Sequence, residues 1–173
     1  MRRAYIDLQF APNWELIDPA REFLLRFLAQ ALGDPVAASQ VSMAAHELLE
    51  NAIKYSPNDE ANVRIEVDSD GPVRLIVENE GLPTHIPVLM EELRMISEAN
   101  DPAALYRQKM ELAVTRSDGK CCLGLARIRC EAEMSLRGSV AGTRVMMIAE
   151  RNTTPRPTTT TPTAPPKTAE RTS

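Results

Sequence analysis

The sequence predicts an α+β protein, a two-layer α/β sandwich in which helices cover one face of a mixed, mainly antiparallel sheet. Three observations support this fold class. Apolar residues alternate with polar ones in short segments near both ends of the domain, as in half-buried strands. Two long segments have apolar residues at helical spacing. The predicted order of elements is strand, helix, helix, strand, strand, an irregular helical segment, helix, strand and strand.

The chain begins with one predicted strand and two predicted helices. Residues 3–10 alternate between apolar and polar side chains, and Pro12 ends this first strand. Residues 13–32 and 36–55 each carry an apolar stripe at helical spacing. Gly33 follows the first stripe and is a typical stop signal, so we expect two separate helices here.

A hairpin and a helical region follow. Residues 62–68 and 72–78 predict two strands joined around Asp70-Gly71, a dipeptide that favours tight hairpin turns. Residues 83–119 predict a helical but irregular segment, because three prolines interrupt it. Residues 121–132 predict one more helix.

The domain is expected to close with a second hairpin. Residues 133–138 and 143–149 predict its two strands, with a turn between Gly138 and Gly142. We therefore expect a single domain over residues 1–150.

Residues 151–173 are rich in threonine and proline and contain no large apolar side chain, so we expect a disordered tail. The tail carries a net charge of +3, which leaves −7 on residues 1–150 out of the total of −4. An acidic domain with few aromatic residues argues against a nucleic-acid partner and is compatible with a basic protein partner.

No apolar run approaches the length of a membrane-spanning helix, and the N-terminal segment lacks the apolar region of a signal peptide. A cytoplasmic protein without a membrane partner is therefore expected. Cys121, Cys122 and Cys130 lack the spacing of a metal site, and we expect them to be reduced thiols.

The most informative segment is residues 46–56, His-Glu-Leu-Leu-Glu-Asn-Ala-Ile-Lys-Tyr-Ser. Glu47, Asn51 and Lys54 share one face of the predicted helix, opposite an apolar face. A carboxylate can orient or deprotonate a nucleophile, an amide oxygen can bind a hard cation, and an ammonium can pair with a phosphate. Periodicity alone favours an ordinary solvent-exposed face, so the interpretation depends on the literal sequence and on other motifs.

This segment resembles the N-box of the GHKL ATPases, the superfamily of gyrase B, MutL, histidine kinases and anti-sigma-factor serine kinases. The predicted order of elements over residues 1–150 is also similar to the Bergerat fold of that superfamily. The resemblance implies ATP and Mg²⁺ as cofactors. It makes Glu47 the catalytic base, Asn51 the magnesium ligand and Lys54 a contact to phosphate.

A second stretch resembles the first glycine box of the family, which reads approximately Asp-Glu-Gly-x-Gly in the anti-sigma kinases. Asn79 stands where the family has the aspartate that accepts a hydrogen bond from the adenine amine. An asparagine oxygen can accept this bond, although without the charge. Gly81 is retained, and both residues are implied to hold adenine. Pro83 replaces the second glycine and stiffens the hinge of the nucleotide lid.

The sequence Lys-Cys-Cys-Leu-Gly-Leu-Ala, which begins at Lys120, resembles the second glycine box, Gly-x-Gly-Leu-Gly-Leu-Ala. Lys120 and Cys122 replace the glycines whose small size lets backbone amides approach phosphates. Gly124 and Leu125 are retained, and Thr143 resembles the threonine before the family's final strand. The resemblance implies that Gly124, Leu125 and Thr143 line the nucleotide site.

A single domain of this size is most similar to the anti-sigma and partner-switching serine kinases. The resemblance implies an ATP-binding signalling regulator with serine/threonine protein kinase activity. Its partner would be a regulatory protein, an antagonist or a sigma-like factor, and a homodimer is also allowed. His46 and His85 lie outside any dimerising phosphoacceptor helix, so we expect structural or surface roles for both.

One alternative stays open, and another is disfavoured. The altered glycine boxes favour a GHKL-fold protein-interaction module that no longer turns over ATP. A stand-alone ATPase of the gyrase or MutL type would need a transducer domain, for which residues 1–150 leave no room.

Overall fold

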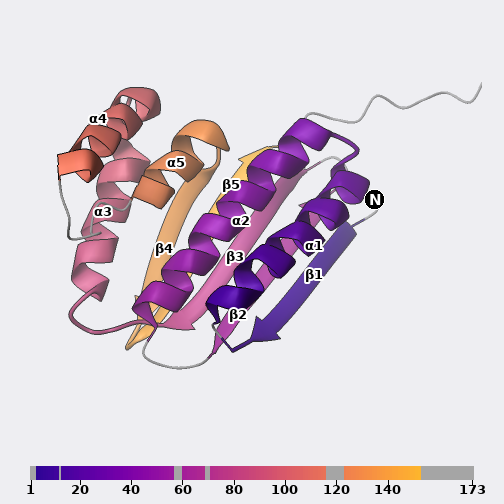
Figure 1. Cartoon of the computed structure of the whole chain (residues 1–173), viewed down its shortest axis with the longest axis horizontal. Helices are drawn as coiled ribbons and strands as arrows, with labels where there is room; N and C mark the ends of the chain where they lie inside the picture. The colour runs from indigo at the N-terminus through magenta and orange to yellow at the C-terminus, as the bar shows by residue number, and fades with distance from the viewer. Residues whose placement is uncertain (1–2, 12, 57–59, 69–70, 116–122, 153–173) are drawn as a thin grey trace, which may run out of the picture.

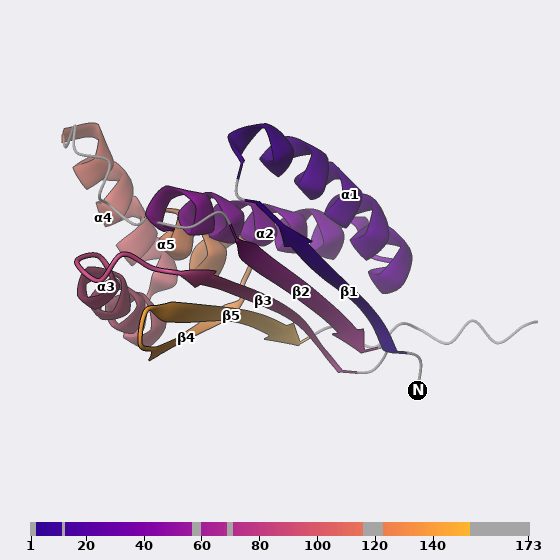
Figure 2. The same cartoon turned by 90° about the horizontal axis from the view of Figure 1, so that it is seen from below.

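The computed structural model describes residues 3–11, 13–56, 60–68, 71–115 and 123–152. Within these residues the chain forms five helices and one five-stranded sheet. Figure 1 shows the helices lying over the sheet, and Figure 2 shows the sheet from its side with the first two helices on one face. The predicted two-layer α+β sandwich is confirmed.

The sheet has the strand order β1-β2-β3-β5-β4, and every neighbouring pair is antiparallel. Its strands are β1 (Arg3–Phe10), β2 (Ala61–Asp68), β3 (Pro72–Glu80), β4 (Ser135–Ala141) and β5 (Arg144–Asn152). Alternate residues of the three central strands are buried under the helices, among them Val63, Ile65, Leu75, Val77, Val145 and Met147. The period of two therefore separates an apolar face from a polar one.

The helices are α1 (Trp14–Leu32), α2 (Pro35–Tyr55), α3 (Ile86–Glu98), α4 (Pro102–Thr115) and α5 (Leu123–Glu131). The irregular helical segment predicted after β3 is thus a pair of helices, α3 and α4. Pro102 begins α4 at a position that proline tolerates. The amide of Ala104 donates to Oδ1 of Asp101 at 2.9 Å, which satisfies one of the unpaired donors of the first turn.

Local signals set the junction between α1 and α2. Asn13 caps α1 by accepting a hydrogen bond from the amide of Glu15 at 3.0 Å. Gly33 ends this helix in the left-handed region with a φ of 66°, which glycine adopts without strain. Asp34 then caps α2, and its Oδ1 accepts from the amide of Val36 at 2.9 Å.

Helix α2 lies at the centre of the core. It packs on α1, on α5 and on the sheet, and it buries Ala38, Val41, Ala44, Ala45, Leu48, Leu49 and Ala52. The four alanines allow close approach to neighbouring backbones, while the larger side chains fill the space above the sheet. The remaining face of α2, which carries Glu47, Asn51 and Lys54, is consequently fixed in direction.

The opposite face of the sheet carries a ladder of ion pairs across all five strands. The ladder joins Asp7 to Arg64 (3.1 Å), Arg64 to Glu66 (2.8 Å), Glu66 to Arg74 (3.3 Å), Arg74 to Glu150 (2.8 Å) and Glu150 to Arg137 (3.3 Å). Charges of both signs alternate across the strands, as expected for a face that none of the described helices covers.

One predicted turn is wrong. Gly138 lies inside β4, opposite Met147, and the turn of the hairpin falls at Gly142, whose φ is 66°. A Cβ atom on Gly138 would lie 2.5 Å from Cδ2 of the buried Leu93 and 3.2 Å from Sδ of Met147. A larger residue than Gly138 would therefore collide with α3, which packs directly on β4. The backbone conformation at Gly138 does not itself require glycine.

The last strand runs past residue 150, the predicted end of the domain. Arg151 and Asn152 end β5, and Arg151 is paired with Val73 in the sheet register. Residues 153–173 lie outside the described residues, as do Asp70, Cys121 and Cys122. Cys130 is half-buried and forms no disulfide with the described residues. None of the described helices combines the length and the apolar character needed to cross a membrane.

We expect the substitution Gly138→Val to lower the free energy of unfolding by about 1–3 kcal/mol, because the added side chain overpacks the contact between α3 and β4. Ser139→Val is the matched control, since Ser139 is exposed on the other face of the same strand. Its effect should stay within about 0.5 kcal/mol. Urea denaturation of both variants measures the difference, and equal stabilities would contradict the packing described above.

Candidate functional site

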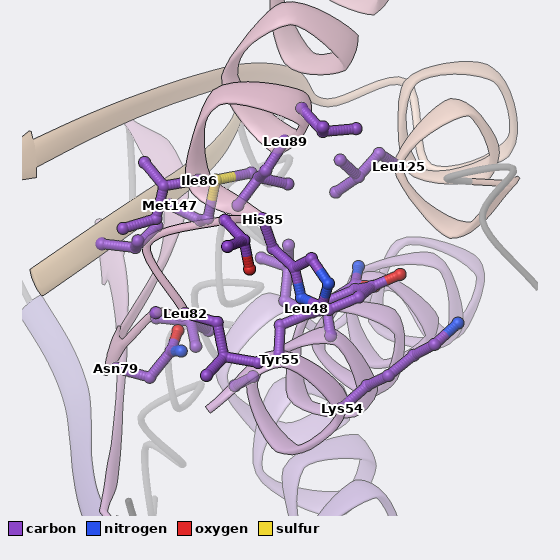
Figure 3. A pocket seen from close by; sticks show the side chains of 17 residues that line it. Leu48, Lys54, Tyr55, Asn79, Leu82, His85, Ile86, Leu89, Leu125 and Met147 are labelled. Atoms are coloured by element: carbon purple, nitrogen blue, oxygen red, sulfur yellow. The ribbon is translucent and has the colours of Figure 1, made fainter. Parts of the chain in front are cut away.

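A cavity of about 470 Å³ lies where the C-terminal half of α2 meets the ends of β3 and β5, the start of α3 and the first turn of α5. Figure 3 shows Ile86, Leu89 and Leu125 on one side of the cavity and Leu48 and Tyr55 on the other. The lining is mostly apolar and comprises Leu48, Asn51, Ala52, Lys54, Tyr55, Val77, Asn79, Gly81, Leu82, Thr84, His85, Ile86, Val88, Leu89, Leu125, Val145 and Met147.

The structure brings most of the predicted site residues together at this cavity. Asn51, Lys54, Asn79, Gly81 and Leu125 all line it, although they come from α2, β3, the segment after β3 and α5.

The other predicted residues lie beside the cavity without lining it. The backbone oxygen of Thr143 accepts a hydrogen bond from the amide of Gly81 at 2.8 Å. Glu47 lies one helical turn before Asn51, and its carboxylate packs against Gly124.

The segment after β3 is held in place by backbone hydrogen bonds. Besides the bond from Gly81 to Thr143, the amide of Leu82 donates to the oxygen of Tyr55 at the end of α2, at 3.2 Å. A Cβ atom on Gly81 would lie 2.9 Å from Cγ2 of Val145. Gly81 therefore lets this segment pass close to β5, and that close approach closes one side of the cavity.

Two asparagines supply amide groups at the cavity wall. Nδ2 of Asn79 donates to the backbone oxygen of Glu80 at 2.7 Å, and its Oδ1 accepts no hydrogen bond from the part of the chain that the structure describes. The side chain of Asn51 makes no hydrogen bond to the described residues. Both amides can therefore contact a bound molecule.

The rim of the cavity contains groups that the sequence did not identify. His85 packs edge-to-face on Tyr55, with ring centroids 5.3 Å apart and an interplanar angle of 82°. Nζ of Lys54 lies 5.2 Å from the centre of the Tyr55 ring, a cation–π distance. Lys54 belongs to the predicted polar stripe of α2, which is formed by Glu47, Asn51 and Lys54. Tyr55 follows it directly in the chain, so the position of Tyr55 was a usable signal. The contribution of His85 depends on the path of the segment after β3.

His46 lies on the same helix but has a different environment. Its Nε2 is 3.3 Å from Oε1 of Glu50, one turn further along α2, and its side chain is 25% exposed. His46 does not line the cavity. His46 therefore pairs with Glu50 at the surface of α2 and is not part of the site.

The carboxylate of Glu47 belongs to a network that joins three helices. Oε1 of Glu47 accepts a hydrogen bond from Nη1 of Arg127 on α5 at 3.1 Å. Nε of Arg127 donates to Oε2 of Glu131 at 2.8 Å. The pKa of Arg127 is raised, first by the bond to Glu131 and also by the bond to Glu47. The predicted base is therefore held by a cation 80 residues away in the chain.

Tyr106 extends this network to α4. Burial of its phenol is the main reason why its pKa is raised, and a hydrogen bond with Glu131 is the second. The network thus runs from α4 through α5 to the polar stripe of α2. No group of three or more His, Cys, Asp or Glu side chains is placed to hold a metal ion among the residues that the structure describes.

No protein-family model and no curated protein sequence matches this chain. Among solved structures, the fold is similar to a chain in the crystal structure of the SiaB–SiaC complex from Pseudomonas aeruginosa, with a TM-score of 0.66 and 20% sequence identity. The similarity covers 84% of this chain and 88% of that chain. At this level of identity the comparison shows a shared fold.

We expect the Tyr106 phenol to titrate above the ordinary tyrosine pKa of 10.0. Because the folded state holds the proton more tightly than the unfolded state, the stabilising contribution of Tyr106 is present below pH 10 and is lost as the pH rises through the folded-state pKa. The difference in absorbance at the phenolate band between wild type and Tyr106→Phe measures this pKa. Glu131→Gln should lower it, and a midpoint at or below 10 would contradict the network.

Proposed function

We propose that this chain is an ATP-binding regulatory protein of the histidine kinase-like ATPase type, acting on a protein partner in signalling. One observation carries the proposal. Asn51, Lys54, Asn79, Gly81 and Leu125, which the family resemblance assigns to a nucleotide, come from four separate segments and line one cavity.

The chemistry of the cavity fits a nucleoside. Its volume of about 470 Å³ falls within the usual range for small-molecule sites. Apolar side chains such as Leu48, Leu89 and Met147 form walls suited to a flat base. Oδ1 of Asn79 is available to accept a hydrogen bond from the exocyclic amine of adenine.

The polar stripe of α2 would serve the phosphate end. Bound Mg²⁺–ATP would supply a transferable phosphoryl group. Asn51 would offer its oxygen to the magnesium ion, which commonly takes few protein ligands because phosphates complete its coordination. Lys54 would pair with a phosphate, and Glu47 would orient a hydroxyl of the partner as a base. These roles describe serine/threonine protein kinase activity.

A protein partner is the second part of the proposal. The similar solved structure is described as a complex of two proteins, SiaB and SiaC, which supports a function exercised through protein binding. The resemblance to partner-switching kinases supports an antagonist or a sigma-like factor as the partner.

A second candidate function rests on the position of Glu47. Its carboxylate is paired with Arg127 and lies beside the cavity lining. Because Arg127 already occupies this carboxylate, Glu47 is not free to act as a base on a substrate hydroxyl. This favours a protein-interaction module without catalytic activity. Asn51-dependent ATP turnover or phosphoryl transfer to a partner would exclude this alternative.

We expect Mg²⁺–ATP to bind the wild-type protein in isothermal titration calorimetry, and Asn51→Ala to weaken its magnesium-dependent affinity at least tenfold, on the order of 1.4 kcal/mol. The reason is that Asn51 is the protein ligand assigned to the ion. Asn62→Ala is the matched control, because Asn62 is an exposed asparagine on β2. A folded wild-type protein that binds no ATP at millimolar concentration would end the proposal.

A further inference from the structure

Glu47 on α2 and Arg127 on α5 form an ion pair next to the cavity, and both of these helices contribute residues to the cavity lining. Glu47 precedes Leu48 on α2, and Gly124 precedes Leu125 on α5; the two leucines line the cavity. Arg127 follows about one turn after Gly124. The pair therefore lies directly beside the α2–α5 side of the cavity.

Gly124 makes this arrangement possible. A Cβ atom at this position would collide with Oε2 of Glu47, so the carboxylate rests in the space that the missing side chain leaves. In the family that the sequence resembles, glycines of this box let backbone amides approach phosphates. Here a carboxylate of the protein itself lies against that part of α5.

Arg127 is more exposed to solvent than Glu47, so it can be reached by a ligand. The side chain of Arg127 is 40% exposed, whereas that of Glu47 is 14% exposed. Arg127 is also held from its other side by Glu131 through Nε, at 2.8 Å. The guanidinium can consequently exchange the partner of Nη1 while the bond to Glu131 keeps it in place, and its planar geometry suits phosphate as well as carboxylate.

We propose that Arg127 is a positioning residue for which Glu47 and the phosphates of a bound nucleotide compete. Without nucleotide, Arg127 holds the Glu47 carboxylate against Gly124. When phosphates bind, Arg127 pairs with them, and Glu47 is released from the ion pair. This inference rests on the proposed function, and it makes the availability of Glu47 depend on the charge of the ligand.

The test compares ATP with adenosine, which shares the base and ribose but carries no phosphate. Calorimetry on the full chain measures the dissociation constants of ATP and of adenosine, and the ratio of these two constants is compared between variants. Glu47→Gln removes the competing anion, so ATP should bind roughly three- to tenfold more tightly relative to adenosine. Arg127→Met should weaken ATP relative to adenosine by a similar factor, and Arg127→Lys should restore part of the loss because it keeps the charge.

The double variant Glu47→Gln with Arg127→Met decides whether the two residues act on each other. If the competition is for Arg127, the gain from Glu47→Gln shrinks when Arg127 is absent, and the two effects are not additive. Arg137→Met and Glu98→Gln are the charge-matched controls, because both side chains are exposed in ion pairs that contain no cavity residue. These controls should leave the ratio unchanged.

The outcomes separate this inference from the proposed function. If adenosine and ATP both fail to bind folded wild type, the proposed function fails. If both bind and the ratio is unaffected by Glu47→Gln and Arg127→Met, or if the two effects simply add, the nucleotide site stands and the competition for Arg127 is wrong. Thermal unfolding of each variant shows that the comparison is made between folded proteins.

Discussion

The burial of one face of α2 determines how the residues of the site are arranged. Ala44, Ala45, Leu48 and Ala52 are buried between α1, α5 and the sheet. This helix cannot rotate about its axis without exposing apolar surface, at about 25 cal/mol for each Å². Packing thereby fixes the direction of Glu47, Asn51 and Lys54. Asn51 and Lys54 consequently line the cavity, and Glu47 lies at its margin.

Besides α2, the cavity depends on β3, on β5, on the segment after β3 and on α5. The ends of β3 and β5 form its floor, and the segment after β3 is tied to α2 by the hydrogen bond from Leu82 to Tyr55. Helix α5 brings Leu125 to the cavity and Arg127 to Glu47. The site therefore combines a fixed apolar compartment with a charged pair beside it. That combination suits a ligand with an apolar ring at one end and anionic groups at the other.

Much of the fold could be predicted from the sequence because it follows from local periodicity. The strand over residues 3–10 and the helices of the first half were set by alternation, by the apolar stripes and by Gly33. Gly138 was misinterpreted because its requirement comes from Leu93, which belongs to a different element. Long-range contacts also explain why His85, Ile86 and the Arg127–Glu47 pair were not foreseen as parts of the site. The nucleotide itself stays a prediction from the resemblance.

A crystal structure with magnesium and a non-hydrolysable ATP analogue will show whether the cavity beside α2 holds the base of a nucleotide. We expect an adenine ring enclosed by Leu48, Leu89 and Met147, within hydrogen-bond distance of Oδ1 of Asn79, with the metal ion on Asn51. A well-ordered protein whose cavity excludes the analogue at millimolar concentration, or an analogue bound elsewhere on the surface, would contradict it.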